Sequence, residues 1–298
     1  MLRTRENRNQ SRFMQDRACI PRILDFPTSS AAMRPLLISL LSIACLFAVA
    51  APKEEVKPLK VLMITGGCCH DYENQKLILS EGLSARANVE FTIVHEEGPE
   101  GKKDKSHKIS IYEKDNWAEG YDVILHNECF GGVDDVAFVE RIAKAHHNGV
   151  PAVMLHCSTH SYRTAKTDEW RKCVGQTSMS HEKNRDLNVK NIAEGHPVMK
   201  GFPAEWLDAK DELYKNEKLW EHFVPLAKAY GEDTKMDHNV IWVNEYGKAK
   251  VFGTTLGHGN ETVQSPVYLD LVARGLLWTC GKLGEDGKPL PGYEAKQK

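Results

Sequence analysis

The chain has 298 residues with 39 basic and 41 acidic side chains, a formal net charge of −2 at pH 7. Without residues 1–50, which hold seven arginines and three acidic side chains, the balance is 32 to 38, a net charge of −6. This negative balance argues against nucleic acid or an anionic membrane as a partner. The remaining residues, about 240, suffice for one large domain with a substantial core.

The first 50 residues have the pattern of a targeting signal. Met33 and Arg34 precede an apolar run over 36–47, and small residues follow up to Ala51. A positive start, a short apolar run and a small-residue site are typical of a secretory signal peptide, here cleaved near Ala50. The run is shorter than the roughly 20 residues that a membrane span needs. We therefore predict a periplasmic or secreted protein with no stable membrane span after processing.

Two further expectations concern this N-terminal region. Residues 1–32 are rich in arginine and show no pattern, so we interpret Met33 as the true start and the preceding residues as an upstream extension. Ser42–Cys45 loosely resembles a lipobox, which leaves a lipoprotein anchored at Cys45 as an alternative. We expect residues 51–58 to form a Lys/Glu-rich linker, 59–282 the folded domain and 283–298 a polar tail.

The first half of the domain alternates between short apolar runs and amphipathic segments. The expected order is strand 59–65, glycine turn 66–67, helix 72–87, strand 89–95, charged loop 96–114, strand 121–126, helix from 136 and strand 153–155. Such alternation predicts a parallel sheet with right-handed crossovers. The fold class is therefore α/β.

After Arg163 the pattern becomes less regular. Residues 177–196 and 200–218 are mostly polar and give no element. The remaining expected elements are strands 223–230 and 240–243, a hairpin turn at 246–248, strand 251–256 and a terminal helix over 267–279.

Histidines stand at or just after the ends of several predicted strands. The parallel ends of an open α/β sheet lie side by side, and ligands bind there. We therefore expect one cleft that gathers residues from these ends: His70, His126, His156, Cys157, His160 and His258. Each imidazole taken singly is more commonly a hydrogen-bonded core or rim residue, so the case for a site rests on the whole set.

The chemistry available to this cleft is open between two mechanisms. His156 and His160 are four residues apart, and neutral imidazoles bind zinc and related divalent ions. His181 and the acidic pair Asp211 and Glu212 would complete such a site. The alternative is proton transfer by histidine or glutamate, which needs no metal.

The cysteines raise a separate question. The processed chain keeps six of them: Cys68, Cys69, Cys129, Cys157, Cys173 and Cys280. An even number in an exported protein suggests disulfides, but the domain is large and has no CxxC spacing, so we expect most to be buried free thiols. Cys157 at its strand end is either a nucleophile activated by a nearby imidazole or a small buried residue. The absence of flanking glycines favours the second interpretation.

Several motifs together resemble the trehalose-utilisation (ThuA-like) family. They cover most of 59–281 in order: Gly66, Gly67, His70, Asp71 and Tyr72; the run 149–156; Ser180 to Glu182; His196, Pro197 and Gly201; Asp211 to Tyr214; Thr255 to His258; and Gly275 with Trp278. The resemblance implies a class I glutamine amidotransferase-like fold, a flavodoxin-like three-layer sandwich with a mainly parallel central sheet. It also implies a role in sugar catabolism. Cys157 falls at or within one residue of the position of the amidotransferase nucleophile. The amidotransferase His-x-Glu motif is matched only loosely, by His258 and Glu261.

The leading hypothesis is an enzyme that hydrolyses, eliminates or isomerises a small sugar or keto-sugar derivative. Its expected catalytic residues are His70, His156, His258 and Glu212, and its expected substrate-binding residues are His126, His160, Asp211 and Tyr214. A divalent metal ion such as zinc would be held by His156 and His181. Two alternatives remain: a non-catalytic carbohydrate-binding module whose tryptophans stack on sugars, and an amidotransferase-type hydrolase that depends on Cys157.

Overall fold

The computed structural model describes residues 55–296. The predicted signal peptide, the upstream extension and the first half of the linker lie outside these residues. Among the described residues, no helix is both long enough and apolar enough to cross a membrane.

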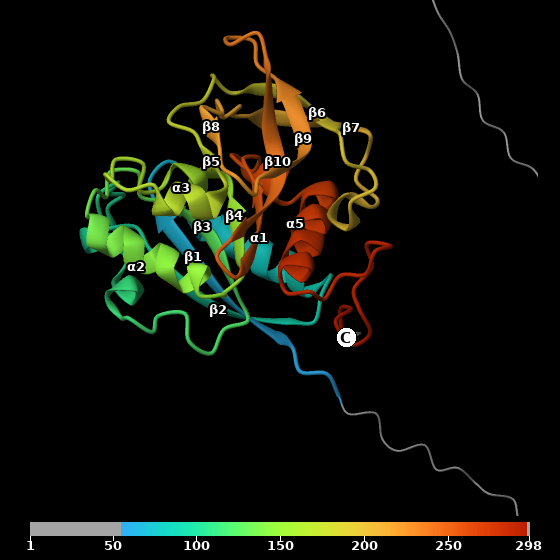
Figure 1. Cartoon of the computed structure of the whole chain (residues 1–298), viewed down its shortest axis with the longest axis horizontal. Coiled ribbons are helices and arrows are strands. Elements are labelled where there is room, and N and C mark those ends of the chain that lie inside the picture. Colours follow the sequence, from blue (N-terminus) through green and yellow to red (C-terminus); the bar gives the residue numbers. More distant parts are fainter. Residues whose placement is uncertain (1–54, 297–298) are drawn as a thin grey trace, which may run out of the picture. The chain divides into compact units, whose positions relative to one another are not determined.

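The centre of the domain is a parallel sheet built from the apolar runs of the sequence. Five strands are adjacent in the order β2-β1-β3-β4-β11, and each pair is parallel (Figure 1). Their bounds are β1 Leu59–Gly67, β2 Val89–Glu96, β3 Val123–Cys129, β4 Ala152–Leu155 and β11 Ala249–Thr254. β1, β3 and β4 are buried almost throughout, as expected for strands covered on both faces.

Helices cover both faces of this sheet. On one face α1 (Tyr72–Ser84) packs beside α5 (Pro266–Thr279), and on the other α2 (Val136–His147) packs beside α3 (Glu169–Val174). The strands supply alternate side chains to the two layers: Val123 and Leu125 join the α1/α5 core, and Ile124 joins the α2/α3 core. The predicted three-layer α/β sandwich is confirmed.

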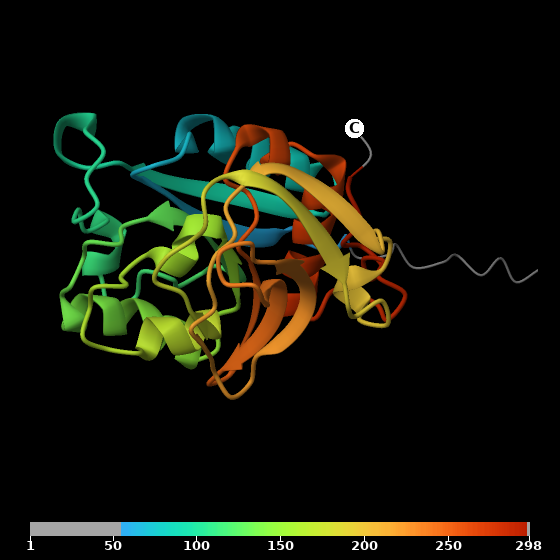
Figure 2. The ribbon, with the colours of Figure 1, turned by 90° about the horizontal axis from the view of Figure 1, so that it is seen from above.

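An antiparallel arm extends the sheet beyond β11 and was only partly expected. Its order is β11-β10-β9-β6-β7, and it rises above one end of the parallel strands (Figures 1 and 2). Strands β9 (Val224–Tyr230) and β10 (Asp237–Tyr246) overlap the predicted ones. Strands β6 (Arg185–Asn191) and β7 (Glu205–Asp211) lie in the stretches to which the sequence assigned no element.

Shorter elements complete the described domain. They are the two-stranded sheet of β5 (Gln176–Thr177) and β8 (Lys218–Leu219), helix α4 (Asn260–Val263), and the 3-10 helices η1 (Pro99–Gly101), η2 (Ser110–Glu113), η3 (His156–His160) and η4 (Pro197–Met199). The predicted polar tail is not free of the domain over its described part. The backbone N–H of Asn88 donates to the carbonyl of Tyr293, and Ala87 forms a bridge with Glu294.

Candidate functional site

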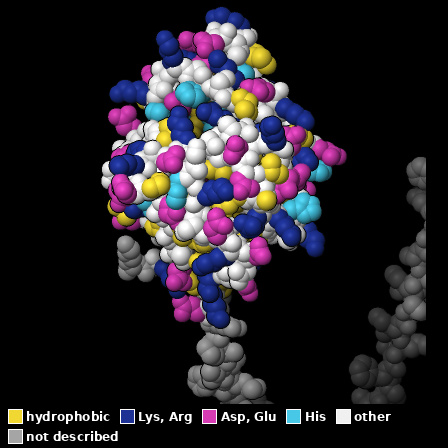
Figure 3. All heavy atoms as spheres, turned by 90° about the vertical axis from the view of Figure 1, so that its left-hand side faces the viewer, with side chains coloured by type: hydrophobic (Ala, Val, Ile, Leu, Met, Phe, Trp, Pro, Cys, Tyr) yellow, Lys and Arg dark blue, Asp and Glu magenta, His cyan; other side chains and the backbone are white. Residues whose placement is uncertain are grey.

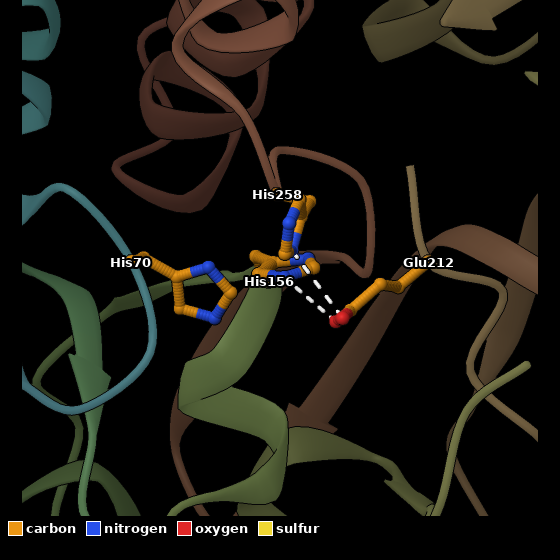
Figure 4. Close-up of side chains that lie close together, drawn as sticks. All are labelled: His70, His156, Glu212 and His258. Atoms are coloured by element: carbon orange, nitrogen blue, oxygen red, sulfur yellow. Dashed lines mark ion pairs between the residues drawn. The ribbon is translucent and has the colours of Figure 1, made fainter. Parts of the chain in front are cut away.

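Four side chains converge where the parallel strands end. His70 lies three residues after β1, His156 directly follows β4, His258 follows β11, and Glu212 directly follows β7. One nitrogen or oxygen atom from each lies within 4.8 Å of those of the other three (Figure 4). We call these four residues the His–Glu cluster. The arm therefore matters for the site, because its last strand delivers the carboxylate to three imidazoles carried by the parallel sheet.

His156 is held in a single orientation by its surroundings. Its backbone has φ of 44°, in the left-handed region that side chains other than glycine rarely adopt. Its Nδ1 lies 2.6 Å from the backbone oxygen of Thr255, so the ring donates its proton there. Nε2 is then free to present its lone pair, 3.5 Å from Oε2 of Glu212 and 3.4 Å from the hydroxyl of Tyr214.

His70 and His258 approach each other edge to face, with ring centroids 4.9 Å apart. Burial lowers the pKa of His70 to about 2, and a proton on either neighbouring imidazole, His156 or His258, would act in the same direction, so the ring of His70 is neutral. Contact with Glu212, at 3.4 Å from Nδ1, raises the pKa of His258. The Nδ1 atoms of His70 and His258 are buried and make no hydrogen bond within the described part of the chain.

Glu212 is the negative charge of the cluster. Burial would raise the pKa of its carboxyl group, but the neighbouring imidazoles of His156 and His258 hold it below the usual range. The preceding residue, Asp211, is fully buried and supports the surrounding backbone. Its carboxylate accepts N–H groups from three residues: Glu212 at 2.6 Å, Gly257 at 2.7 Å and His258 at 3.2 Å.

Three residues of the cluster, His70, Glu212 and His258, line a cavity of about 180 Å³. Imidazoles, sulfur atoms, two cationic side chains and one carboxylate line it: Cys68, Cys69, His70, Lys105, Cys129, Gly131, Cys157, His160, Arg163, His181, Glu212, Tyr214 and His258. This lining suits a small polar ligand rather than an extended apolar one.

Comparison with known proteins fixes the family. The sequence profile described as "ThuA: Trehalose utilisation" matches residues 60–279. The chain belongs to the ThuA family. No curated protein gives a significant match to this ThuA-family chain.

Solved structures show the same fold. A ThuA-like protein from Parabacteroides merdae ATCC 43184 has a TM-score of 0.59 at 20% identity, over 80% of this chain and 98% of that one. A ThuA-like protein from Bacteroides uniformis ATCC 8492 has a TM-score of 0.57 at 14% identity, over 77% and 94%. A β-galactosidase from Rahnella sp. R3 has a TM-score of 0.50 at 15% identity, over 74% of this chain and 32% of that one. At identities this low the similarity establishes the fold alone.

The ThuA-family chain places three other predicted residues at the cavity. Tyr214 stacks on His160, with ring centroids 3.8 Å apart and planes inclined by 8°. Nε2 of His160 lies 2.8 Å from the hydroxyl of Ser178. His181 is the most exposed of the three and lies 3.6 Å from Oε1 of Glu212, outside the His–Glu cluster.

Two residues expected to bind substrate do not line the cavity. Asp211 contacts backbone amides, as described above. His126 is fully buried on the α2/α3 side, where Nδ1 lies 2.8 Å from Glu128 and Nε2 lies 3.0 Å from Nε2 of His146. The physical reason is strand alternation: on β3, His126 points to the same layer as Ile124, and Cys129 at the strand end reaches the cavity instead.

The expectation of free thiols is wrong for four of the six cysteines. Disulfides join Cys68 to Cys69 and Cys129 to Cys157, whereas Cys173 and Cys280 are free. The sulfur of Cys157 is therefore bonded and is not a free nucleophile in this structure. The sequence holds a signal for each pair, since Cys68 and Cys69 are adjacent and Cys129 and Cys157 stand at the ends of two predicted parallel strands, β3 and β4.

Proposed function

We propose that the protein is an exported enzyme of carbohydrate catabolism, which binds a divalent metal ion in the His–Glu cluster and acts on a sugar or keto-sugar derivative. The observation that carries the proposal is the convergence of three imidazoles and one carboxylate within 4.8 Å at the carboxyl ends of the strands. The family description supports the substrate class, and the pattern of residues 33–51 supports export.

The residues fit a metal ion of the zinc type. Imidazole nitrogen and carboxylate oxygen are ordinary zinc ligands. The neutral ring of His70 and the free Nε2 of His156 have lone pairs available, and the buried Nδ1 atoms of His70 and His258 lack other partners. The bond from His156 to the Thr255 carbonyl is the kind of outer contact that orients a metal-binding imidazole. A bound ion would polarise a carbonyl or hydroxyl oxygen of the substrate.

Other side chains of the cavity have complementary roles. Lys105 and Arg163 supply positive charge for hydroxyl and carbonyl oxygens of the substrate. Nδ1 of His181 lies 2.8 Å from the carbonyl oxygen of Glu182 and donates to it, so its Nε2 is free to accept a proton. We assign proton transfer to His181, because it lines the cavity and lies outside the His–Glu cluster.

The test is turnover of a panel containing trehalose, other disaccharides and their keto derivatives. The purified protein is assayed after chelation and after reloading with zinc, manganese or calcium. We expect activity on at least one keto-sugar that is lost on chelation and restored by one of the ions. His156→Ala and Glu212→Gln should lower kcat at least a hundredfold, whereas His222→Ala, a change at an exposed histidine, should not.

Two results would count against this proposal. Sugar binding without turnover, unaffected by His156→Ala, would favour a carbohydrate-binding module. If turnover persists after chelation and also in Glu212→Gln, the reaction does not need a metal ion. Proton transfer by the histidines would then be the remaining mechanism.

A further inference from the structure

The two disulfides lie against each other beside the cavity. Cys68, Cys129 and Cys157 form one buried cluster with Tyr72, and Cys69 is exposed next to it. The Sγ atoms of Cys68 and Cys129, which belong to different disulfides, are 3.8 Å apart. The backbone N–H of Cys68 also donates to the carbonyl of Cys129 at 3.2 Å, which fixes the two strand ends together.

We propose that these four cysteines form a thiol–disulfide relay, in which Cys68–Cys69 receives electrons from an external dithiol and passes them to Cys129–Cys157. The proposal does not depend on the metal site or on the sugar chemistry. Its basis is the contact between sulfur atoms of two disulfides, one of which has an exposed end and the other a buried position on the cavity wall.

The first half of the exchange occurs at the surface. A thiolate of the external dithiol attacks Sγ of Cys69, the Cys68–Cys69 bond breaks, and Cys68 leaves as a thiolate. The second thiol of the dithiol then attacks its own mixed disulfide and releases Cys69 as a thiolate. The external dithiol becomes a disulfide, and the pair Cys68 and Cys69 holds the two electrons.

The second half moves those electrons inward. The Cys68 thiolate attacks Sγ of Cys129, the Cys129–Cys157 bond breaks, and Cys157 leaves as a thiolate. Cys69 then attacks Cys68, which restores the outer disulfide and releases Cys129. In sum one external dithiol is oxidised and Cys129–Cys157 is reduced, with the two protons of the dithiol available to the new thiolates.

The inner disulfide lies close to one imidazole of the His–Glu cluster. Ligand atoms of His70, Cys129 and Cys157 lie within 4.8 Å of one another. Reduction of the inner disulfide would therefore place two thiols directly beside an imidazole of the His–Glu cluster.

The test follows reduction of the native protein by dithiothreitol, with alkylation at timed intervals and peptide mapping of each pair. We expect Cys129–Cys157 to be reduced at least tenfold more slowly in the double variant Cys68→Ser/Cys69→Ser than in the wild type. Cys280→Ser, which removes a free thiol outside the cluster, should leave the rate unchanged. Equal rates in the wild type and the double variant would overturn the relay.

A second measurement uses only the wild type and therefore does not depend on correct folding of the variants. With one equivalent of dithiothreitol, mapping should detect a peptide pair that joins Cys129 to Cys68 or Cys69. Partly reduced protein that contains only the two original pairings would contradict the exchange. Repeating the experiment with reduced thioredoxin distinguishes a protein dithiol from a small one as the electron source.

Discussion

At the scale of single residues, the nearby carboxyl groups of Asp208 and Asp211 differ in their surroundings and in their charge. Asp211 accepts three backbone N–H groups, an arrangement that suits a charged carboxylate. Asp208 accepts only the hydroxyl of Thr262, at 2.6 Å, and its second oxygen has no hydrogen bond among the described residues. Burial, and then the charge of Asp211, raises the pKa of Asp208 to about 9, so this group is neutral at pH 7.

Replacing each aspartate by asparagine should therefore change the free energy of unfolding by different amounts. Asp208→Asn replaces a neutral group by a neutral one and should change the free energy of unfolding by less than about 1 kcal/mol. Asp211→Asn weakens charge-assisted hydrogen bonds to the loop that carries His258 and should cost about 2–3 kcal/mol. Urea denaturation at pH 7 measures both values. Equal costs for the two variants would contradict the assigned charge states.

At the scale of elements, β3 and α2 are joined by a buried polar network. His126 connects Glu128 to His146, and Nδ1 of His146 lies 2.8 Å from the carbonyl oxygen of Val150 and donates to it. Burial, and then the charge of His126, lowers the pKa of His146 to about 3. The folded protein thus holds this imidazole neutral far below the pH at which a free histidine gains a proton.

This network predicts a specific dependence of stability on pH. Between pH 6.5 and pH 3 the unfolded chain binds a proton at His146 and the folded chain does not, so acid favours unfolding. Stability is fully present above pH 6.5 and falls below it, by up to about 1.4 kcal/mol per pH unit from this residue.

Comparison of the wild type with His146→Gln isolates that contribution. Urea denaturation at pH 7, 6 and 5 gives the free energy of unfolding of each protein. This free energy should fall less steeply with decreasing pH in the variant. Near pH 5 the difference in slope should correspond to nearly one bound proton. Histidines that do not contact His146 have the same surroundings in both proteins, so their contributions cancel in the comparison. Parallel curves would show that His146 is protonated in the folded state.

The elements that sequence predicted and missed differ in burial pattern. β1, β3 and β4 are covered on both faces, so their sequences are apolar and easily recognised. β6 and β7 expose half of their residues, and four of the seven exposed residues are charged, so their sequences do not form an apolar run. Their pairing comes from contacts distant in sequence, with β6 between β7 and β9, which a local pattern does not record.

The same reasoning explains the outcome for the site. The rule that ligands bind at the ends of parallel strands led to His70, His156 and His258, which the structure brings together. Glu212 was named beside them without a strand to carry it, because β7 was missed. His126 was misplaced because the rule gives the end of a strand but not the face to which a side chain points. The Cys129–Cys157 disulfide was missed because its pairing depends on the distance between two strand ends, and the Cys68–Cys69 disulfide was missed because adjacency in the sequence was not taken as a sign of pairing.

At the scale of the whole molecule, the described C-terminal segment packs against the start of the domain. The side chain of Asn88 donates to the carbonyl of Val56 at 3.2 Å and to that of Gly292 at 2.9 Å. Around this packed body, Lys and Arg are interspersed with Asp and Glu on the face seen in Figure 3. That face carries no field of one sign.

Asn88→Ala tests this packing of the segment. The substitution leaves two carbonyl groups without their donor and should lower the free energy of unfolding by about 1–3 kcal/mol. Asn188→Ala, at an exposed position of β6, is the matched control and should cost less than about 0.5 kcal/mol. Thermal and urea denaturation of the two variants give the comparison. If Asn88→Ala is as stable as the control, the segment does not contribute to the domain.

The central claim is that the His–Glu cluster is one metal site assembled from distant parts of the fold. Isothermal titration of the chelated protein with zinc tests it most directly. We predict one ion per chain and at least a tenfold weaker affinity in His70→Ala, His156→Ala, His258→Ala and Glu212→Gln, with His222→Ala unchanged. Absence of binding by the wild type, or equal affinity in the cluster variants and the control, would contradict the claim.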